Sequence, residues 1–202
     1  NYESEIYLDK LNALEDTYYS KYVHIIRTLA KADDAKILDV GCGTGRVMTI
    51  LQQNGLNNLY GVDISSLFVK TVKKAGFKNV FTYDGNNLPF DVNSFDVIGS
   101  FNVLEHTENP EKYLKDQIKK TKKSGYIIVA CPNFLTVVGN YPHPRIKGLL
   151  NKFKNSHRVF HRLAFRHDIK FEKMDPIIRN DFQYDDDAIV VTNLIDIKRF
   201  FQ

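Results

Sequence analysis

The feature that most constrains the fold is a regular alternation of short, apolar, β-rich runs with helical stretches between Lys36 and Cys131. The runs are nearly continuous in apolar residues, as is typical of strands buried on both faces of a parallel sheet. This alternation predicts a doubly wound α/β core with a mostly parallel sheet. The expected strands are Lys36–Val40, Leu59–Asp63, Val80–Tyr83, Asp96–Ser100 and Tyr126–Cys131, and the expected helices are Arg46–Gln53, Leu67–Ala75 and Pro110–Thr121.

The chain outside this alternation follows other patterns. Up to Ala32, apolar residues recur at helical spacing, which predicts an N-terminal helix. After Pro132 the alternation stops and a basic segment follows. We therefore expect three parts: N-terminal helices with the α/β core over 1–133, a basic helical insertion or lid over 134–192, and a helix that returns to the core over 193–202.

The basic segment runs from His143 to Lys173 and holds nine Lys or Arg and four His against two acidic residues. Its apolar residues recur at helical spacing in two groups, which predicts two short amphipathic helices with basic outer faces. Such helices could form a lid over an acceptor, lie on an anionic membrane surface, contact a phosphate-bearing acceptor, or simply face solvent. The groups are Ile146, Leu149, Leu150 and Phe153, then Val159, Phe160, Leu163 and Ala164, with Arg158, Arg162 and Arg166 behind the second.

Length and composition narrow the class of protein. The 202 residues, 43% hydrophobic and 26% charged, are ordinary for one globular domain with an elaboration. No apolar run approaches the roughly 18 residues of a membrane span, the N-terminus lacks a secretory signal, and only two cysteines occur, so a cytoplasmic protein is expected. A net charge of +4, with an acidic run after the basic segment, disfavours nucleic acid as a partner.

The first expected strand leads into the loop of KILDVGCGTGRV, which carries Gly41, Gly43 and Gly45. A glycine-rich turn between a strand and a helix exposes backbone N–H groups at the carboxyl edge of the sheet, where open α/β sheets bind ligands. A dinucleotide fold requires G-x-G-x-x-G, and a P-loop requires Lys-Ser or Lys-Thr after its last glycine. Both patterns lack a required part here, and a tight connection without a ligand remains an alternative.

Acidic residues end the next two expected strands. Asp63 closes the second strand in LYGVDIS, where a carboxylate can accept hydrogen bonds from both hydroxyls of a ribose. Asp84 closes the third strand in VFTYDGNNLPF, where an acid and the following backbone could bind the amino edge of an adenine. Each could be a solvated loop residue, but two acids at successive strand ends of one sheet together indicate a nucleoside-binding edge.

From about Asp33 to Asn133, the sequence resembles the class I S-adenosylmethionine-dependent methyltransferases, of the small-molecule, methyltransferase-11-like type. The motifs LDVGCGTG, GVDIS, D…LPF…FDVI and VLEH…P carry the resemblance, in the right order and spacing. The resemblance implies a Rossmann-like core, S-adenosylmethionine as cofactor and S-adenosylhomocysteine as product. The cofactor contacts that it implies are Asp39, Gly41, Cys42, Gly43 and Gly45 at the methionine, Asp63 at the ribose, Asp84 and Gly85 at the adenine, Asn102 beside the sulfonium, Ile64 as a further contact, and Tyr18 or Tyr19 as a cover.

Glu105 and His106 follow the fourth expected strand in FDVIGSFNVLEH and are the catalytic candidates. Because imidazole titrates near neutral pH, His106 could act as general base toward a hydroxyl, or it could serve only in packing. Related quinone-biosynthesis methyltransferases carry Glu-x-x-Glu-His here and can hold a divalent metal. Asn102 replaces the first of those acids, so no metal is expected.

We interpret the chain as a methyltransferase that O-methylates a small-molecule or a sugar- or lipid-linked acceptor. The alternatives are a non-catalytic S-adenosylmethionine-binding partner subunit and a nucleotide-dependent oxidoreductase. The resemblance implies seven strands, of which five can be placed, so the closing antiparallel strands are expected to be truncated, with Ala188–Thr192 as a candidate extension. An uncovered sheet edge invites pairing with another chain, which makes a homodimer a further expectation.

Overall fold

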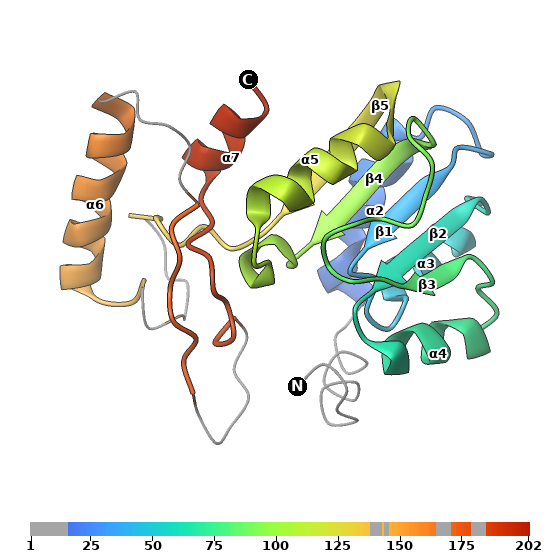
Figure 1. Cartoon of the computed structure of the whole chain (residues 1–202), viewed down its shortest axis with the longest axis horizontal. Helices are drawn as coiled ribbons and strands as arrows, with labels where there is room; N and C mark the ends of the chain where they lie inside the picture. The colour runs from blue at the N-terminus through green and yellow to red at the C-terminus, as the bar shows by residue number, and fades with distance from the viewer. Residues whose placement is uncertain (1–15, 138–142, 144–145, 165–170, 179–184) are drawn as a thin grey trace. The chain divides into compact units, whose positions relative to one another are not determined.

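The computed structural model describes residues 16–137, 143, 146–164, 171–178 and 185–202 (Figure 1). The chain divides into two compact units. The first holds the described residues up to Phe101 together with Lys112–Val129, and the second holds Asn102–Glu111 together with the described residues from Ala130 onward. These boundaries differ from those expected at 133 and 192, because the segment after the fourth strand packs with the later chain. The backbone N–H groups of Ile189 and Val190 both donate to the carbonyl of Glu105.

The first unit contains a five-stranded sheet in the order β3-β2-β1-β4-β5. β1 pairs in parallel with β2 and with β4, and β2 pairs in parallel with β3. Every residue of β1 is buried, so this strand is covered on both faces, as a doubly wound sheet requires. The expected α/β class is confirmed. The strands are β1 (Ile37–Val40), β2 (Leu59–Asp63), β3 (Val80–Thr82), β4 (Phe95–Phe101) and β5 (Thr121–Ala130).

Helices cover the sheet with apolar faces that match the sequence periodicity. They are α2 (Asp16–Leu29), α3 (Arg46–Gln53), α4 (Ser66–Lys74) and α5 (Pro110–Lys120). Val23 and Ile26 of α2, Met48 and Leu51 of α3, and Val72 of α4 lie in one buried cluster with the strands. The Ser65 side chain caps α4 by accepting a hydrogen bond from the Phe68 N–H at 3.2 Å. These helices fix the loops at the carboxyl ends of β1 and β2.

The second unit contains a 3₁₀ turn, η1 (Leu104–His106), and the helices α6 (Leu149–Ala164) and α7 (Leu194–Phe200). Its small core consists of Phe134, Leu135, Ile146, Ala188 and Val191. Val190 forms one isolated antiparallel bridge with Lys173, so Ala188–Thr192 does not extend the sheet as a sixth strand. No helix in the described part of the chain is long and apolar enough to cross a membrane.

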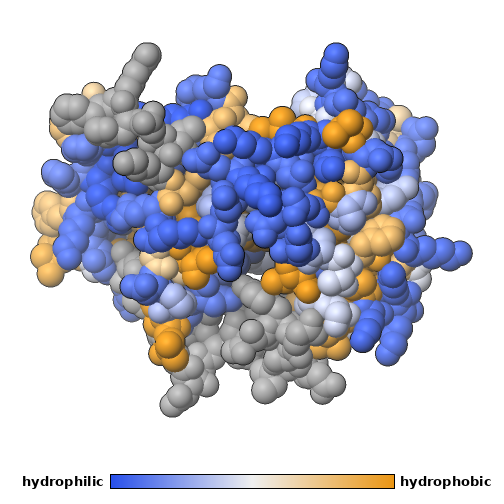
Figure 2. All heavy atoms as spheres, viewed as in Figure 1, coloured by the Kyte–Doolittle hydropathy of each residue, from blue (hydrophilic) through white to orange (hydrophobic). Residues whose placement is uncertain are grey.

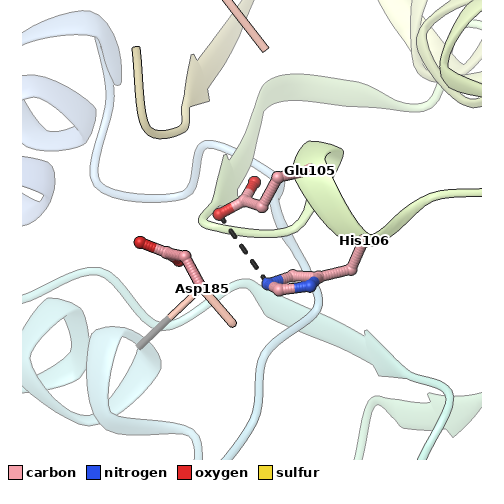
Figure 3. Close-up of side chains that lie close together, drawn as sticks. All are labelled: Glu105, His106 and Asp185. Carbon is pink, nitrogen blue, oxygen red and sulfur yellow. Dashed lines mark ion pairs between the residues drawn. The ribbon is translucent and has the colours of Figure 1, made fainter. Parts of the chain in front are cut away.

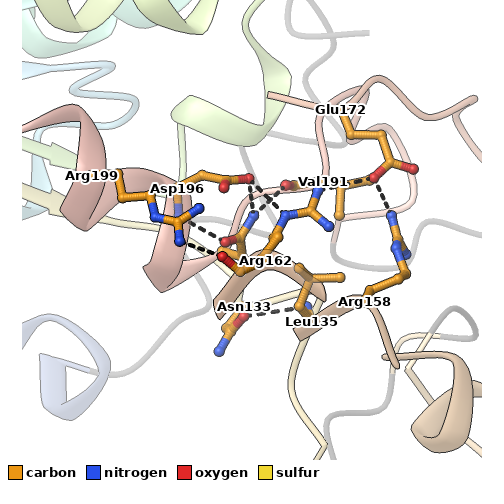
Figure 4. A network of polar contacts seen from close by, with 9 residues as sticks. Asn133, Leu135, Arg158, Arg162, Glu172, Val191, Asp196 and Arg199 are labelled. Atoms are coloured by element: carbon orange, nitrogen blue, oxygen red, sulfur yellow. Dashed lines mark hydrogen bonds and ion pairs between the residues drawn. The ribbon is translucent and has the colours of Figure 1, made fainter. Parts of the chain in front are cut away.

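The basic segment differs from its prediction in two ways. One continuous helix, α6, replaces the two short helices. Its arginines also do not form a free outer face: Arg158 and Arg162 pair with Glu172, and Arg162 also contacts Asp196 at 3.3 Å (Figure 4). Ion pairing explains this orientation, because the mostly buried guanidinium of Arg162 needs carboxylate partners and this unit supplies two. Arg166 lies outside the described residues.

Candidate functional site

The glycine loop after β1 has the backbone that its sequence predicts. Gly41, Gly43 and Gly45 have φ values of 76°, 50° and 75°, in the left-handed region that favours glycine. The N–H groups of Gly41 and Cys42 donate to the carbonyl of Val62, which ties the loop to the end of β2. A Cβ on Gly45 would lie 2.9 Å from a methyl group of Val72, so this glycine also permits close helix packing.

Asp63 lies at the end of β2 and is joined to the glycine loop. Its Oδ2 accepts a hydrogen bond from the Gly43 N–H at 2.8 Å, and its Oδ1 accepts one from the Ser65 N–H at 2.9 Å. Asp63 therefore connects the glycine loop to the turn that leads into α4.

Asp39 and Cys42 are both buried at the base of the loop. Burial, together with the nearby charge of Asp63, raises the pKa of Asp39 from 3.8 to about 7. The Cys42 side chain belongs to the buried core, and its sulfur would lie 3.0 Å from a Cβ on Gly61. Any contact of Cys42 with a ligand would therefore be made by its backbone, not its thiol.

The residues expected at the adenine, Asp84 and Gly85, follow β3, and the cofactor candidate Ile64 follows β2. Ile64 exposes 48% of its surface, and its methyl group would lie 3.6 Å from a Cβ on Gly85. Asp84 accepts hydrogen bonds from the N–H groups of Asn86 and Asn87 and from the Asn87 side-chain amide. These bonds lower the pKa of Asp84 to about 2 and hold a turn. The structure thus gives Asp84 a local role that needs no ligand.

The catalytic candidates lie in the second unit, where the structure brings together residues far apart in sequence. Glu105 is fully buried, and its carboxylate oxygens accept no hydrogen bond from the described residues. The Nε2 atom of His106 lies 3.8 Å from Oε1 of Glu105, and its Nδ1 lies 3.5 Å from Oδ1 of Asp187 (Figure 3 shows the first contact). Burial raises the pKa of Glu105 well above its ordinary value, and the charges of Asp185 and Asp187 raise it further.

Sequence reasoning missed the aspartates that approach His106. In the sequence, Asp185 and Asp187 are only members of an acidic run, and no local motif assigns them a function. The signal that could have identified them is the position of this run just before the apolar residues Ala188–Val191, since a buried segment brings its neighbours inward.

Asn102, whose φ of 55° is unusual for a residue other than glycine, donates its backbone N–H to the Ala130 carbonyl at 2.7 Å.

The Glu105 region also offers metal-ligating groups. Glu105, His106 and Asp185 can each supply one ligand atom, and these atoms lie within 4.8 Å of one another. The expectation of no metal, which rests on Asn102 in place of an acid, stays a prediction. The fold brings the carboxylate of Asp185 near Glu105 and His106 from a distant part of the chain.

A separate cavity in the second unit does not include these residues. Its volume is about 610 Å³, and one ion pair, between Arg162 and Glu172, lies in its wall. The lining residues are Glu108, Asn109, Pro110, Glu111, Arg162, Phe171 and Glu172.

Comparison with known proteins identifies the α/β core. A sequence model of the Methyltransf_11 family, which describes a methyltransferase domain, matches residues 38–129. Residues 38–129 of the chain match a methyltransferase domain, in agreement with the resemblance of the sequence to the class I S-adenosylmethionine-dependent enzymes. The match spans the glycine loop, both strand-end aspartates, and Glu105 and His106. It confirms the family resemblance seen in the sequence, and with it S-adenosylmethionine as the cofactor.

Three similar proteins place the methyltransferase domain among its relatives. An uncharacterized protein of Methanocaldococcus jannaschii is 31% identical over 156 residues, which cover 74% of this chain and 59% of that protein. The mitochondrial ubiquinone biosynthesis O-methyltransferase of Schizosaccharomyces pombe is 30% identical over 105 residues, 47% of this chain and 37% of that enzyme. A complex between the Haloferax volcanii Trm112 methyltransferase activator and a methyltransferase matches with a TM-score of 0.54 and 20% identity, over 61% of this chain and 57% of the matched chain. That last likeness concerns the fold alone, and the chain spans about half the length of the curated relatives it matches.

The loop of the methyltransferase domain fits a nucleoside cofactor. Three left-handed glycines leave the backbone bare at the carboxyl end of β1, and the Asp63 carboxylate lies beside them at the end of β2. The exposed side chain of Ile64, opposite Gly85, offers an apolar surface on which a flat base could lie. The donor and acceptor set therefore suits a ribose with an attached base, without a requirement for a phosphate.

Replacing Asp63 with Ala should weaken S-adenosylhomocysteine binding by about 1.5–3 kcal/mol, since it removes charge-assisted hydrogen bonds. It also removes the acceptor of the Gly43 N–H, which adds to the loss. Asp96→Ala is the matched control, because Asp96 likewise accepts a backbone N–H, that of Lys36 at 2.9 Å, but lies near the amino end of β4. Calorimetry on both folded variants checks this, and an unchanged affinity in Asp63→Ala would refute the ribose assignment.

The raised pKa of Asp39 predicts a pH dependence of stability. Folded Asp39 keeps its proton up to about pH 7, whereas an unfolded aspartate loses it near its ordinary value of 3.8. Between these values the folded state binds more protons, so the free energy of unfolding should fall as pH rises, by up to about 4 kcal/mol. Asp39→Asn should remove this fall. Urea unfolding of both proteins at a series of pH values tests it, and parallel curves would contradict it.

Proposed function

We propose that this chain transfers the methyl group of S-adenosylmethionine to an oxygen atom of a small-molecule or a sugar- or lipid-linked acceptor. The observation that carries the choice of an oxygen acceptor is the environment of His106. This imidazole is only partly buried, and its Nδ1 faces the Asp187 carboxylate at 3.5 Å. A hydroxyl must lose its proton as it attacks, and an imidazole beside a carboxylate can take it. The Schizosaccharomyces pombe relative, an O-methyltransferase by name, supports the same acceptor chemistry.

When bound, S-adenosylmethionine supplies a methyl group on a positively charged sulfur, which needs no further activation. The residues of the chain then have three tasks. Gly43 and Asp63 hold the nucleoside portion through the loop backbone and the ribose hydroxyls. His106 accepts the acceptor proton at Nε2, and Asp187 stabilises the resulting imidazolium through Nδ1. Glu105 lies beside the ring, with Oε1 at 3.8 Å from Nε2, and burial raises its pKa well above the ordinary value.

Binding and turnover are tested separately. Calorimetry with S-adenosylmethionine, S-adenosylhomocysteine and NAD is expected to give binding of the first two alone; binding of NAD would favour the oxidoreductase alternative. A screen of hydroxyl-bearing acceptors for conversion of S-adenosylmethionine to S-adenosylhomocysteine then tests the enzyme. Binding without conversion across phenol, sugar and polyprenol acceptors would favour a non-catalytic partner subunit. Conversion is expected to continue on addition of a chelator, and its loss would show that the reaction requires a metal.

A further inference from the structure

Helix α6 carries large apolar side chains on its outer face. Five of them expose 65–78% of their surface, which is unusual for leucine and phenylalanine in a folded unit. At roughly 100° per residue, Leu149, Phe153, Phe160 and Leu163 fall within one narrow stripe, and Leu150 lies beside it. Orange spheres reach the surface in Figure 2 on the side where Figure 1 shows α6. The five residues, which we call the α6 stripe, are Leu149, Leu150, Phe153, Phe160 and Leu163.

The opposite face of α6 holds the helix in this orientation by polar contacts. Asn155 is 3% exposed, and its amide donates to the carbonyls of Phe134 at 3.0 Å and Thr136 at 3.3 Å. Arg162 contacts Glu172 and Asp196, and its own carbonyl accepts a hydrogen bond from Arg199 (Figure 4). An amphipathic helix normally turns its apolar face toward the core. In α6, the face that packs against the rest of the unit carries polar groups instead. The α6 stripe therefore points outward in the folded unit.

The charged residues of α6 that flank the α6 stripe are lysines. No Asp or Glu occurs between Asp116 and Asp168 in the sequence. Within the described residues, the ion pairs of α6 involve Arg158 and Arg162 but none of its lysines. Lys152 lies on one flank of the stripe and Lys154 on the other, and Lys147 precedes the helix. An apolar stripe flanked by lysines complements a membrane surface whose headgroups are anionic and whose interior is apolar.

We propose that α6 lies in the plane of an anionic membrane surface, with the α6 stripe inserted among the acyl chains and its lysines at the phosphates. The stripe is a continuous apolar surface of the kind that marks an interaction site, and the flanking charge selects an anionic bilayer as the occupant. This inference extends the proposed function, because it favours a lipid-linked acceptor over a freely soluble one. The sequence analysis predicted membrane contact through a basic outer face. In the present proposal the apolar face of α6 inserts instead, and Arg158 and Arg162 form ion pairs with Glu172 and Asp196.

Co-sedimentation of the full chain with vesicles tests the proposal. We expect binding to phosphatidylcholine vesicles that contain phosphatidylglycerol and at least about tenfold weaker binding to phosphatidylcholine alone. The variant Leu149→Ser, Phe153→Ser, Phe160→Ser, Leu163→Ser should reduce binding by at least about tenfold. It should fold normally, because these side chains are exposed. Ile178→Ser is the matched control, since Ile178 is 94% exposed in the same unit but outside α6.

Two outcomes would overturn the proposal. The first is equal vesicle binding by the parent and the fourfold variant. The second is a parent dimer that ignores vesicles and dissociates in the fourfold variant, which would show that the α6 stripe contacts a second copy. A triple variant, Lys147→Glu, Lys152→Glu, Lys154→Glu, should lose the preference for anionic vesicles. An unchanged preference would show that these lysines do not select the lipid. Calorimetry with S-adenosylhomocysteine on every variant keeps this result separate from the methyltransferase proposal, since vesicle binding requires no turnover.

Discussion

His106→Ala is expected to lower kcat by about 10²-fold or more while leaving the affinity for S-adenosylhomocysteine nearly intact. The imidazole is the group proposed to accept the acceptor proton, and Asp187 at 3.5 Å from Nδ1 stabilises the protonated ring. S-adenosylhomocysteine formation with an acceptor from the screen measures turnover, and calorimetry measures the affinity. Asp187→Asn should lower kcat by a smaller factor, because the base remains and only the neighbouring charge is lost.

The control for this prediction is His24→Ala, which removes an exposed imidazole from α2. Its kcat should match that of the parent. If His106→Ala lowered turnover, cofactor affinity and thermal stability together, His106 would be a packing residue of η1 and not a base. A kcat equal to that of the parent would exclude it from proton transfer.

Gly43→Val is expected to abolish measurable cofactor binding, a larger effect than that of Asp63→Ala. Gly43 has a φ of 50°, which a β-branched residue adopts only with strain, and its N–H donates to Asp63 at 2.8 Å. A side chain at this position would also occupy the space that the bare loop leaves for the ligand. Calorimetry with S-adenosylhomocysteine gives the affinity, and circular dichroism shows whether the variant is folded.

Gly55→Val is the control that distinguishes an effect of backbone strain from damage to the cofactor site. Gly55 has a φ of 85°, and a Cβ there would meet nothing within 4 Å, so the variant carries similar strain of roughly 1–3 kcal/mol far from the loop. It should lose stability but keep its affinity for S-adenosylhomocysteine. Tight binding by a folded Gly43→Val variant would contradict the assignment of this loop to the cofactor.

The sequence alone determined the sheet and the cofactor loop, because both depend on local signals. Apolar runs and helical periodicity located all five strands and the helices α2 to α5, but β5 begins at Thr121 and not at the expected Tyr126. Glycine spacing predicted the left-handed backbone at Gly41, Gly43 and Gly45, since few other residues adopt it. The position of Asp63 at a strand end placed its carboxylate beside that loop. These features follow from backbone sterics and from burial on both faces of the sheet.

Only the tertiary structure decided which face of a helix is buried and which distant residues meet. Periodicity showed that α6 is amphipathic, but its apolar face points outward because Arg162 finds carboxylate partners in Glu172 and Asp196, 10 and 34 residues away. In the same way, the approach of Asp187 to His106 depends on the packing of the segment that contains Ala188 and Val191. An ion pair or a buried contact between distant segments leaves no periodic signal in the sequence, so its outcome appears only when the chain is folded.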